Sequence, residues 1–191
     1  NNSNLGAATS AGVVLRTVEY AEELAKAADL PLVATTVDAR LYDALKEQVE
    51  SLKEKGVHPG LAVILVGEDP ASQVYVRNKG LACEQLGMTS ETLRLPAETS
   101  QEELENIIDN LNRDDRYNGI LVQLPLPKHF NEEEILLAIS PLKDVDGFHP
   151  ENVGNLSIGR KGFVSCTPAG VIELLKRTGI EMEGKECVVL G

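Results

Sequence analysis

Two polar side chains that could carry out acid–base chemistry, Tyr75 and Lys79, stand four residues apart in this chain of 191 residues. On a helix, this spacing makes a phenol and an ammonium group neighbours on one face. Burial beside an apolar wall lowers the pKa of a lysine, so Lys79 could exchange protons near neutral pH. When the helix is considered alone, an ordinary amphipathic helix with a solvated lysine is the simpler interpretation.

The sequence predicts the helix that would carry this pair. Asp69 suits the N-cap, Pro70 suits the first helical position, and Gly87 suits the C-terminal stop. Ala82 and Leu86 continue the face of Tyr75 and Lys79, and we expect this face to point toward the interior.

Strands and helices are expected to alternate around this helix. Apolar runs such as LAVILV and GILVQL have the length and composition of buried strands. We expect strands over 61–66, 89–95, 119–124 and 186–190, and helices over 16–29, 38–56, 69–87, from 100 to about 111, 131–139 and 167–179. Residues 30–35 could form an extended segment after the first helix. Residues 142–165 are expected to be irregular because they are rich in Gly, Asp and Asn.

This alternation predicts a three-layer α/β domain with a largely parallel sheet, followed by the first strand of a truncated Rossmann domain. We divide the chain into an N-terminal segment of unknown role (1–36), a catalytic domain (37–180) and the start of the second domain (181–191).

Candidate ligand-binding residues follow the carboxyl ends of the strands, where ligands collect in such sheets. Gln123 is the polar residue in an apolar strand, and its amide could either tie down the next loop or contact a substrate. In the long loop, we expect one of Asp144 and Asp146 to hold the loop and the other to face a cavity.

The composition limits the partners. Lys and Arg total 18 against 30 Asp and Glu, so the net charge of −12 argues against nucleic acid or an anionic membrane. The three cysteines form no C-x-x-C motif, the three histidines are isolated, and we expect no metal site and a reducing compartment. No apolar run approaches the roughly 20 residues that span a bilayer.

Residues 38–191 closely resemble the bifunctional 5,10-methylenetetrahydrofolate dehydrogenase/cyclohydrolase family. The resemblance is carried, in the family's order, by GLAVILVGEDPASQVYVRNKGLACEQLG, NGILVQLPLPKH, KDVDGFHPENVGNL, CTPAG and GKECVVLG. Ser165 stands where the family usually has proline.

The resemblance implies an enzyme of one-carbon folate metabolism that supports purine biosynthesis. Such enzymes oxidise 5,10-methylenetetrahydrofolate with NADP or NAD and hydrolyse the methenyl product to 10-formyltetrahydrofolate. Lys79 would then transfer the proton in the cyclohydrolase step, Gln123 would modulate its protonation, and Tyr75 would position the folate. Asp146 would hydrogen-bond the pterin ring.

Further implications concern the cofactor and the assembly. Cys166 and Thr167 match the turn that lies near the nicotinamide, so we expect NADP, with NAD as the alternative. The family is homodimeric through its cofactor domains, so we expect this shorter chain to be monomeric, in the cytoplasm or in an organelle matrix.

Two other interpretations compete with this one. A short-chain dehydrogenase also uses a Tyr-x-x-x-Lys pair, but no glycine-rich dinucleotide loop precedes Tyr75, so this class is rejected. The chain stops at Gly191, where family members continue, so we expect a fragment whose complete activity needs more chain. A module that binds folate or a partner subunit without catalysis is therefore the second hypothesis.

Overall fold

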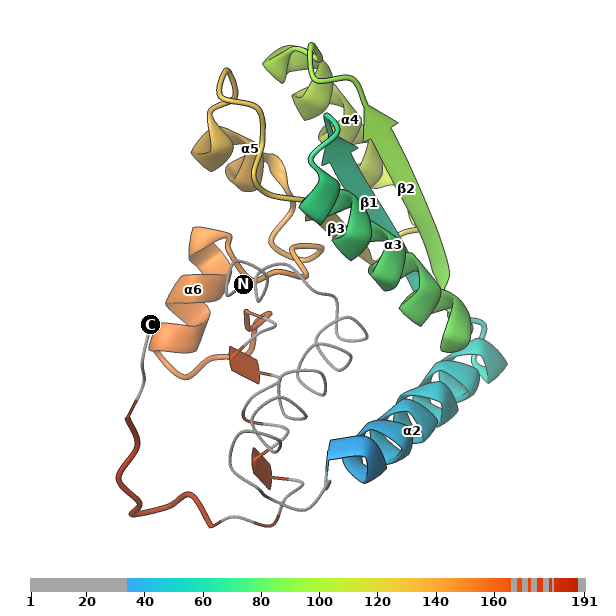
Figure 1. The fold of residues 1–191 in the computed structure, drawn as a ribbon, viewed down its shortest axis with the longest axis vertical. Helices are drawn as coiled ribbons and strands as arrows, with labels where there is room; N and C mark the ends of the chain where they lie inside the picture. Colours follow the sequence, from blue (N-terminus) through green and yellow to red (C-terminus); the bar gives the residue numbers. More distant parts are fainter. Residues whose placement is uncertain are drawn as a thin grey trace.

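The computed structural model describes residues 34–165, 168–169, 172, 175–176, 179 and 181–188. Strands and helices alternate through most of this region (Figure 1). The elements are α2 (Ala34–Glu54), β1 (Gly60–Val66), α3 (Pro70–Gln85), β2 (Thr89–Leu95), α4 (Gln101–Arg113), β3 (Gly119–Val122), α5 (Glu132–Ala138) and α6 (Pro150–Ser157).

The three strands form one parallel sheet in the order β2-β1-β3. All seven residues of the central strand β1 are buried, as its unbroken apolar run predicts. At the outer edge of β3, Asp144 forms a parallel bridge with Ile120, so the loop after α5 runs alongside the sheet. Because this pairing is parallel, Asp146 follows toward the carboxyl end of β3.

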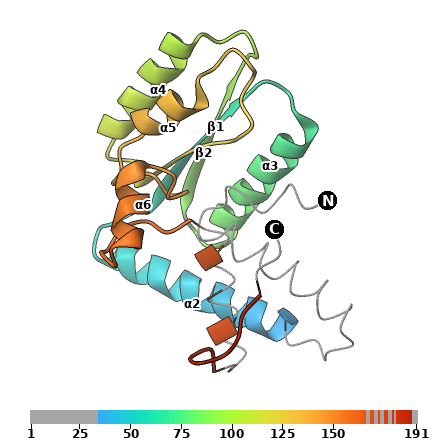
Figure 2. The same cartoon turned by 90° about the vertical axis from the view of Figure 1, so that its left-hand side faces the viewer.

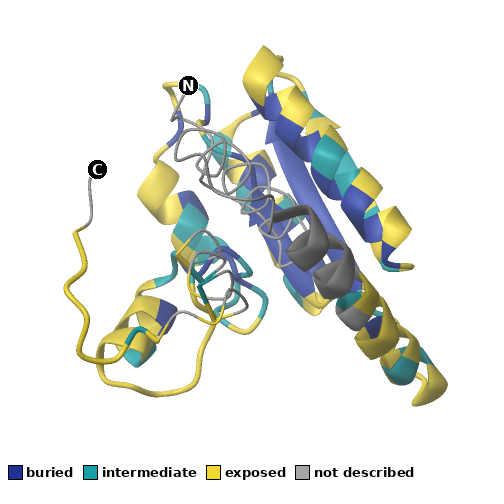
Figure 3. Cartoon of the chain, turned by 60° about the horizontal axis from the view of Figure 1, so that its bottom comes forward, coloured by how far each residue is buried: buried dark blue, intermediate teal, exposed yellow. Residues whose placement is uncertain are grey.

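Helices cover both faces of the sheet (Figure 2). On one face, Ala62 and Ile64 of β1 belong to a buried cluster with Leu104 and Ile108 of α4 and Ile135 of α5. On the other face, the alternate residues of β1 pack with α3 in a cluster of Leu61, Val63, Leu65, Val76, Cys83 and Leu121. The buried strands between helices with exposed outer faces (Figure 3) confirm the predicted three-layer α/β architecture.

The predicted start and stop of the helix α3 are confirmed, and α4 has a cap of the same kind. Asp69 Oδ2 accepts a hydrogen bond from the Ser72 amide at 2.7 Å, and Pro70 is the first residue of α3. Ser100 Oγ likewise accepts from the Glu103 amide at 3.2 Å at the start of α4. Gly87 adopts a φ of +72° directly after the C-cap of α3, a conformation that favours glycine.

One expectation was wrong: residues 142–165 contain a helix, α6. His149 caps it through Nδ1, which accepts from the Glu151 amide at 3.1 Å, and Pro150 occupies its first position. This start outweighs the low helix propensity of the Asn and Gly residues that follow.

Smaller differences concern the ends of the chain. The helix expected over 38–56 spans Ala34–Glu54; Val49 on this helix is buried, whereas Leu52 is exposed. Of the helix expected over 167–179, the described residues 168–169, 172 and 175–176 are helical. Residues 186–188 of the expected last strand are not in a strand. The segments expected over 16–29 and 30–33 lie outside the described residues, as do residues 189–191. The predicted domain boundaries stay predictions.

Candidate functional site

Lys79 and Gln123 form a buried hydrogen bond between two elements. Lys79 Nζ donates to Gln123 Oε1 at 2.9 Å, and the lysine is only 4% exposed. The interpretation of Lys79 as a solvated lysine is therefore wrong. Whether burial lowers its pKa stays a prediction.

The position of Gln123 is set by the end of β3. Its backbone amide donates to Ile64 O of β1 at 2.9 Å, which holds the residue against the central strand. Its side-chain Nε2 donates to Leu124 O at 2.7 Å, so its oxygen is directed at Lys79. The side-chain amide of Gln123 thus bonds to both Leu124 in the adjoining loop and the lysine.

Asp146 is the carboxylate of this cluster. It is 6% exposed, and burial raises its pKa to about 6; the nearby Lys79 ammonium lowers this pKa and the charge of Asp144 raises it. The charges of Lys79 and Asp146 therefore lie close enough to interact. We call Lys79, Gln123 and Asp146 the polar cluster.

Tyr75 lies one helical turn before Lys79 on α3 and is also buried. The buried residues of α3 are Ser72, Tyr75, Val76, Lys79, Ala82 and Cys83, and Leu86 follows at 2% exposure. The predicted inward-facing stripe is therefore confirmed, and Tyr75 shares it with Lys79.

Asp144 is the aspartate that holds the loop. Its Oδ2 accepts from the His149 amide at 2.8 Å and from Asn152 Nδ2 at 2.9 Å. Asn152 and His149 were not among the residues predicted from sequence, because the segment was expected to be irregular. The His-Pro pair that starts α6 was the signal that could have identified them.

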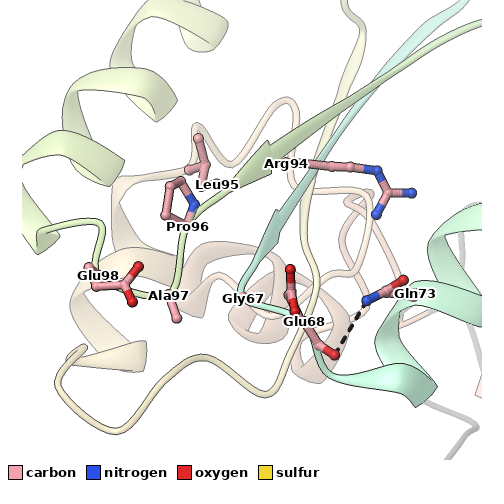
Figure 4. A pocket seen from close by; sticks show the side chains of 8 residues that line it. All are labelled: Gly67, Glu68, Gln73, Arg94, Leu95, Pro96, Ala97 and Glu98. Atoms are coloured by element: carbon pink, nitrogen blue, oxygen red, sulfur yellow. Dashed lines mark hydrogen bonds between the residues drawn. The ribbon is translucent and has the colours of Figure 1, made fainter.

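A separate hollow of about 710 Å³ opens at the carboxyl ends of β1 and β2 (Figure 4). It is lined by Gly67, Glu68, Gln73, Arg94, Leu95, Pro96, Ala97 and Glu98. None of the predicted site residues contributes to it.

Several predicted features receive no test from the described residues. Cys166 and Thr167 lie outside them. Within the described part of the chain, no group of three or more His, Cys, Asp or Glu residues could hold a metal ion. No helix in that part is both long and apolar enough to span a membrane.

A parallel sheet covered by helices on both faces, with buried polar side chains after one strand's carboxyl end, defines an α/β domain with a candidate site at that end of the sheet. Residues 32–146 match the family described as "Tetrahydrofolate dehydrogenase/cyclohydrolase, catalytic domain", which covers more than half of the sequence. The chain belongs to this family.

Curated and solved relatives agree with this assignment. A bifunctional protein FolD from Ruminiclostridium cellulolyticum is 55% identical over 160 residues, which cover 84% of this chain and 56% of that protein. The crystal structure of the bifunctional FolD enzyme from Campylobacter jejuni matches with a TM-score of 0.75 and 51% identity, covering 77% of this chain and 52% of the other.

A third relative is the Trypanosoma brucei methylenetetrahydrofolate dehydrogenase-cyclohydrolase, whose structure is complexed with NADP and an inhibitor. It matches with a TM-score of 0.73 and 39% identity, over 79% of this chain and 52% of that one. The chain therefore spans about half the length of the relatives it matches.

Proposed function

We propose that this chain is the folate-binding catalytic part of a methylenetetrahydrofolate dehydrogenase/methenyltetrahydrofolate cyclohydrolase. The observation that carries the proposal is the buried hydrogen bond between Lys79 and Gln123, coupled electrostatically to Asp146. A buried amine, amide and carboxylate of this kind are costly to fold, and such groups concentrate at functional sites.

In the proposed cyclohydrolase step, water adds to the cationic methenyl carbon and the ring opens to 10-formyltetrahydrofolate. A proton must leave the attacking water, and another must reach the departing nitrogen. Lys79 is the residue that transfers a proton in this step. Gln123 Oε1 holds the Lys79 nitrogen in position and modulates its protonation. Because Lys79 is shielded from bulk water, its interactions with Gln123 and with a reacting proton are stronger than they would be in solvent.

Binding of the substrate is assigned to Asp146 and Tyr75. An ionised Asp146 accepts hydrogen bonds from the amino group and a ring N–H of the pterin, which fixes the orientation of the ring. The aromatic ring of Tyr75 positions the folate one helical turn from Lys79.

For the dehydrogenase step, we propose NADP as the cofactor, with NAD as the alternative. The cofactor supplies the acceptor for the hydride. The NADP complex of the Trypanosoma brucei relative supports this choice. Cys166 and Thr167 are proposed to lie near the nicotinamide, and the complete two-step activity is proposed for a protein of the relatives' length.

The remaining proposals concern the setting of the protein. We propose a small-molecule folate as the partner, with no role for nucleic acid or membranes, and a location in the cytoplasm or an organelle matrix. The 191-residue chain is proposed to be monomeric.

The test is the ultraviolet absorbance of 5,10-methenyltetrahydrofolate, followed over time with and without NADP. We expect the unmodified chain to accelerate hydrolysis and Lys79→Ala to reduce that acceleration by about 10²-fold or more, since proton transfer contributes on this order. Lys128→Ala, at an exposed lysine in the loop after β3, is the control and should hydrolyse at the unmodified rate. Equal rates for Lys79→Ala and the control would refute the role of Lys79.

The same assay separates the second hypothesis, a module that binds folate or a partner subunit without turnover. The observation in its favour is that the chain spans about half of its relatives' length. Binding of methenyltetrahydrofolate by the unmodified chain, with hydrolysis no faster than in buffer, would support the binding module.

A further inference from the structure

The side chain of Asn152 bonds to the backbone at Pro141 and at Phe163 and to the side chain of Asp144. Its Nδ2 donates to Pro141 O at 2.9 Å and to Asp144 Oδ2 at 2.9 Å, and its Oδ1 accepts from the Phe163 amide at 3.1 Å. The residue is 3% exposed. Both N–H donors and the oxygen of this amide are therefore used, in a position closed to solvent.

The first two bonds fix the loop that carries Asp146. Asp144 Oδ2 also accepts from the His149 amide at 2.8 Å. Asp144, two residues before Asp146, is therefore bonded to the start of α6. On the other side, Lys143 O accepts from the Ile120 amide of β3 at 2.8 Å. The loop is thus held to β3 on one side and to α6 on the other.

The third bond reaches the segment that leads to Cys166 and Thr167. At Gly147, directly after Asp146, a Cβ atom would lie 2.8 Å from Ser165 N and 2.9 Å from Val164 C. The backbones of the Asp146 loop and of residues 163–165 therefore pass in direct contact, and Asn152 holds the first residue of that segment.

We propose that Asn152 is a positioning residue that holds Asp146 against the Lys79–Gln123 pair and sets the path of residues 163–165. This inference rests on the proposed function for its link to folate. It adds that the Asn152 side chain, which need not touch the substrate, fixes two parts of the proposed site. These are Asp146, proposed to bind the pterin, and residues 163–165, which lead to the turn proposed to lie near the nicotinamide.

The first test needs no folate. Carbon-13 NMR of the 191-residue chain follows the titration of the Asp146 carboxyl, assigned from the signal lost in Asp146→Asn. In Asn152→Ala, the released loop admits water, so the pKa of Asp146 should fall toward the ordinary range of an aspartate. Asn155→Ala is the control, because it changes the same residue type on the same helix. Among the described residues, the Asn155 side chain has no hydrogen-bond partner, so this variant should leave the pKa of Asp146 unchanged.

The second test is a double-mutant cycle on the affinity for 5,10-methenyltetrahydrofolate. Asn152→Ala should weaken binding at least tenfold, and it should weaken it no further in an Asp146→Ala background, because the residue acts through Asp146. Asn155→Ala should bind as the unmodified chain does. Additive effects of the two substitutions, or an unchanged pKa of Asp146 in Asn152→Ala, would overturn the proposal.

If Asn152→Ala does not fold, as judged by circular dichroism, hydrogen exchange of the unmodified chain decides the matter. The amides of His149 and Phe163 donate to the two linked side chains, so they should open together and exchange with one common free energy. The proposal would be overturned if the opening equilibria of the His149 and Phe163 amides differed by more than tenfold. A chain that binds no folate refutes the proposed function alone, since the titration and the exchange still test Asn152.

Discussion

At the scale of single residues, the molecule places an ammonium group and a carboxylate almost out of contact with water. Removing such charges from water costs several kcal/mol each, and only close partners offset this cost. Lys79 has the Gln123 oxygen at 2.9 Å, and Asp146 has the Lys79 charge nearby. We interpret this arrangement as a stability cost that is retained for chemistry.

The raised pKa of Asp146 predicts how stability changes with pH. The pKa is about 6 in the folded chain and about 3.9 in an unfolded one, so the folded state binds the proton more tightly. The resulting stabilisation is fully present below about pH 4 and is lost as the pH rises through about 6. The loss amounts to at most about 3 kcal/mol.

Asp146→Asn should therefore flatten the decline in unfolding free energy between pH 4 and 7, measured by urea denaturation at each pH. Asp115→Asn, at an exposed aspartate, is the matched control and should retain the decline. If Asp146→Asn declines as steeply as the unmodified chain, the carboxylate is not the group that titrates.

The sequence predicted only part of this site. The spacing of Tyr75 and Lys79 placed them on one helix face, because helical periodicity is local information. The contact of Lys79 with Gln123 joins residues 44 apart in sequence, and no local pattern encodes it. The sequence also left open which of Asp144 and Asp146 holds the loop, because that depends on Asn152 and on the start of α6.

At the scale of elements, the short helix α6 anchors the loop that carries Asp146. Gly147 has a φ of +66°, and an added Cβ would lie 2.8 Å from Ser165 N. Both the backbone conformation and the close approach of two chains therefore require glycine at this position.

Gly147→Ala should lower the unfolding free energy by about 1–3 kcal/mol, through steric overlap and an unfavourable φ. Gly154→Ala, inside α6 with open space around it, should instead raise it by about 0.5–1 kcal/mol, because alanine favours the helix. Thermal and urea denaturation of the two variants measure this contrast. A Gly147→Ala variant as stable as Gly154→Ala would contradict the described loop packing.

Most of the elements were predictable because their signals are local. The unbroken apolar run indicated the strand β1, and the cap at Asp69 indicated the start of α3. The helix expected from residue 100 corresponds to α4. The helix α6 was missed because its composition favours a loop, while a two-residue start signal and the burial of Asn152 favour the helix. Burial of that kind is set by tertiary contacts, which composition does not record.

At the scale of the whole molecule, the sheet separates two packed clusters and brings the polar cluster to one end of β3. The clusters on the two faces draw on alternate residues of β1, so the architecture follows from a single apolar strand buried on both sides. The site depends on this arrangement, because α3 supplies Lys79 from one layer, the residue after β3 is Gln123, and the loop after α5 brings Asp146 alongside β3.

The most direct test of the central claim is a crystal structure of the chain with a stable analogue of 5,10-methenyltetrahydrofolate. The account predicts that the pterin ring lies within hydrogen-bonding distance of the Asp146 carboxylate, with the bridge carbon on the side of Lys79. A ring bound instead in the hollow between Gly67 and Arg94, or no contact with the polar cluster, would contradict it.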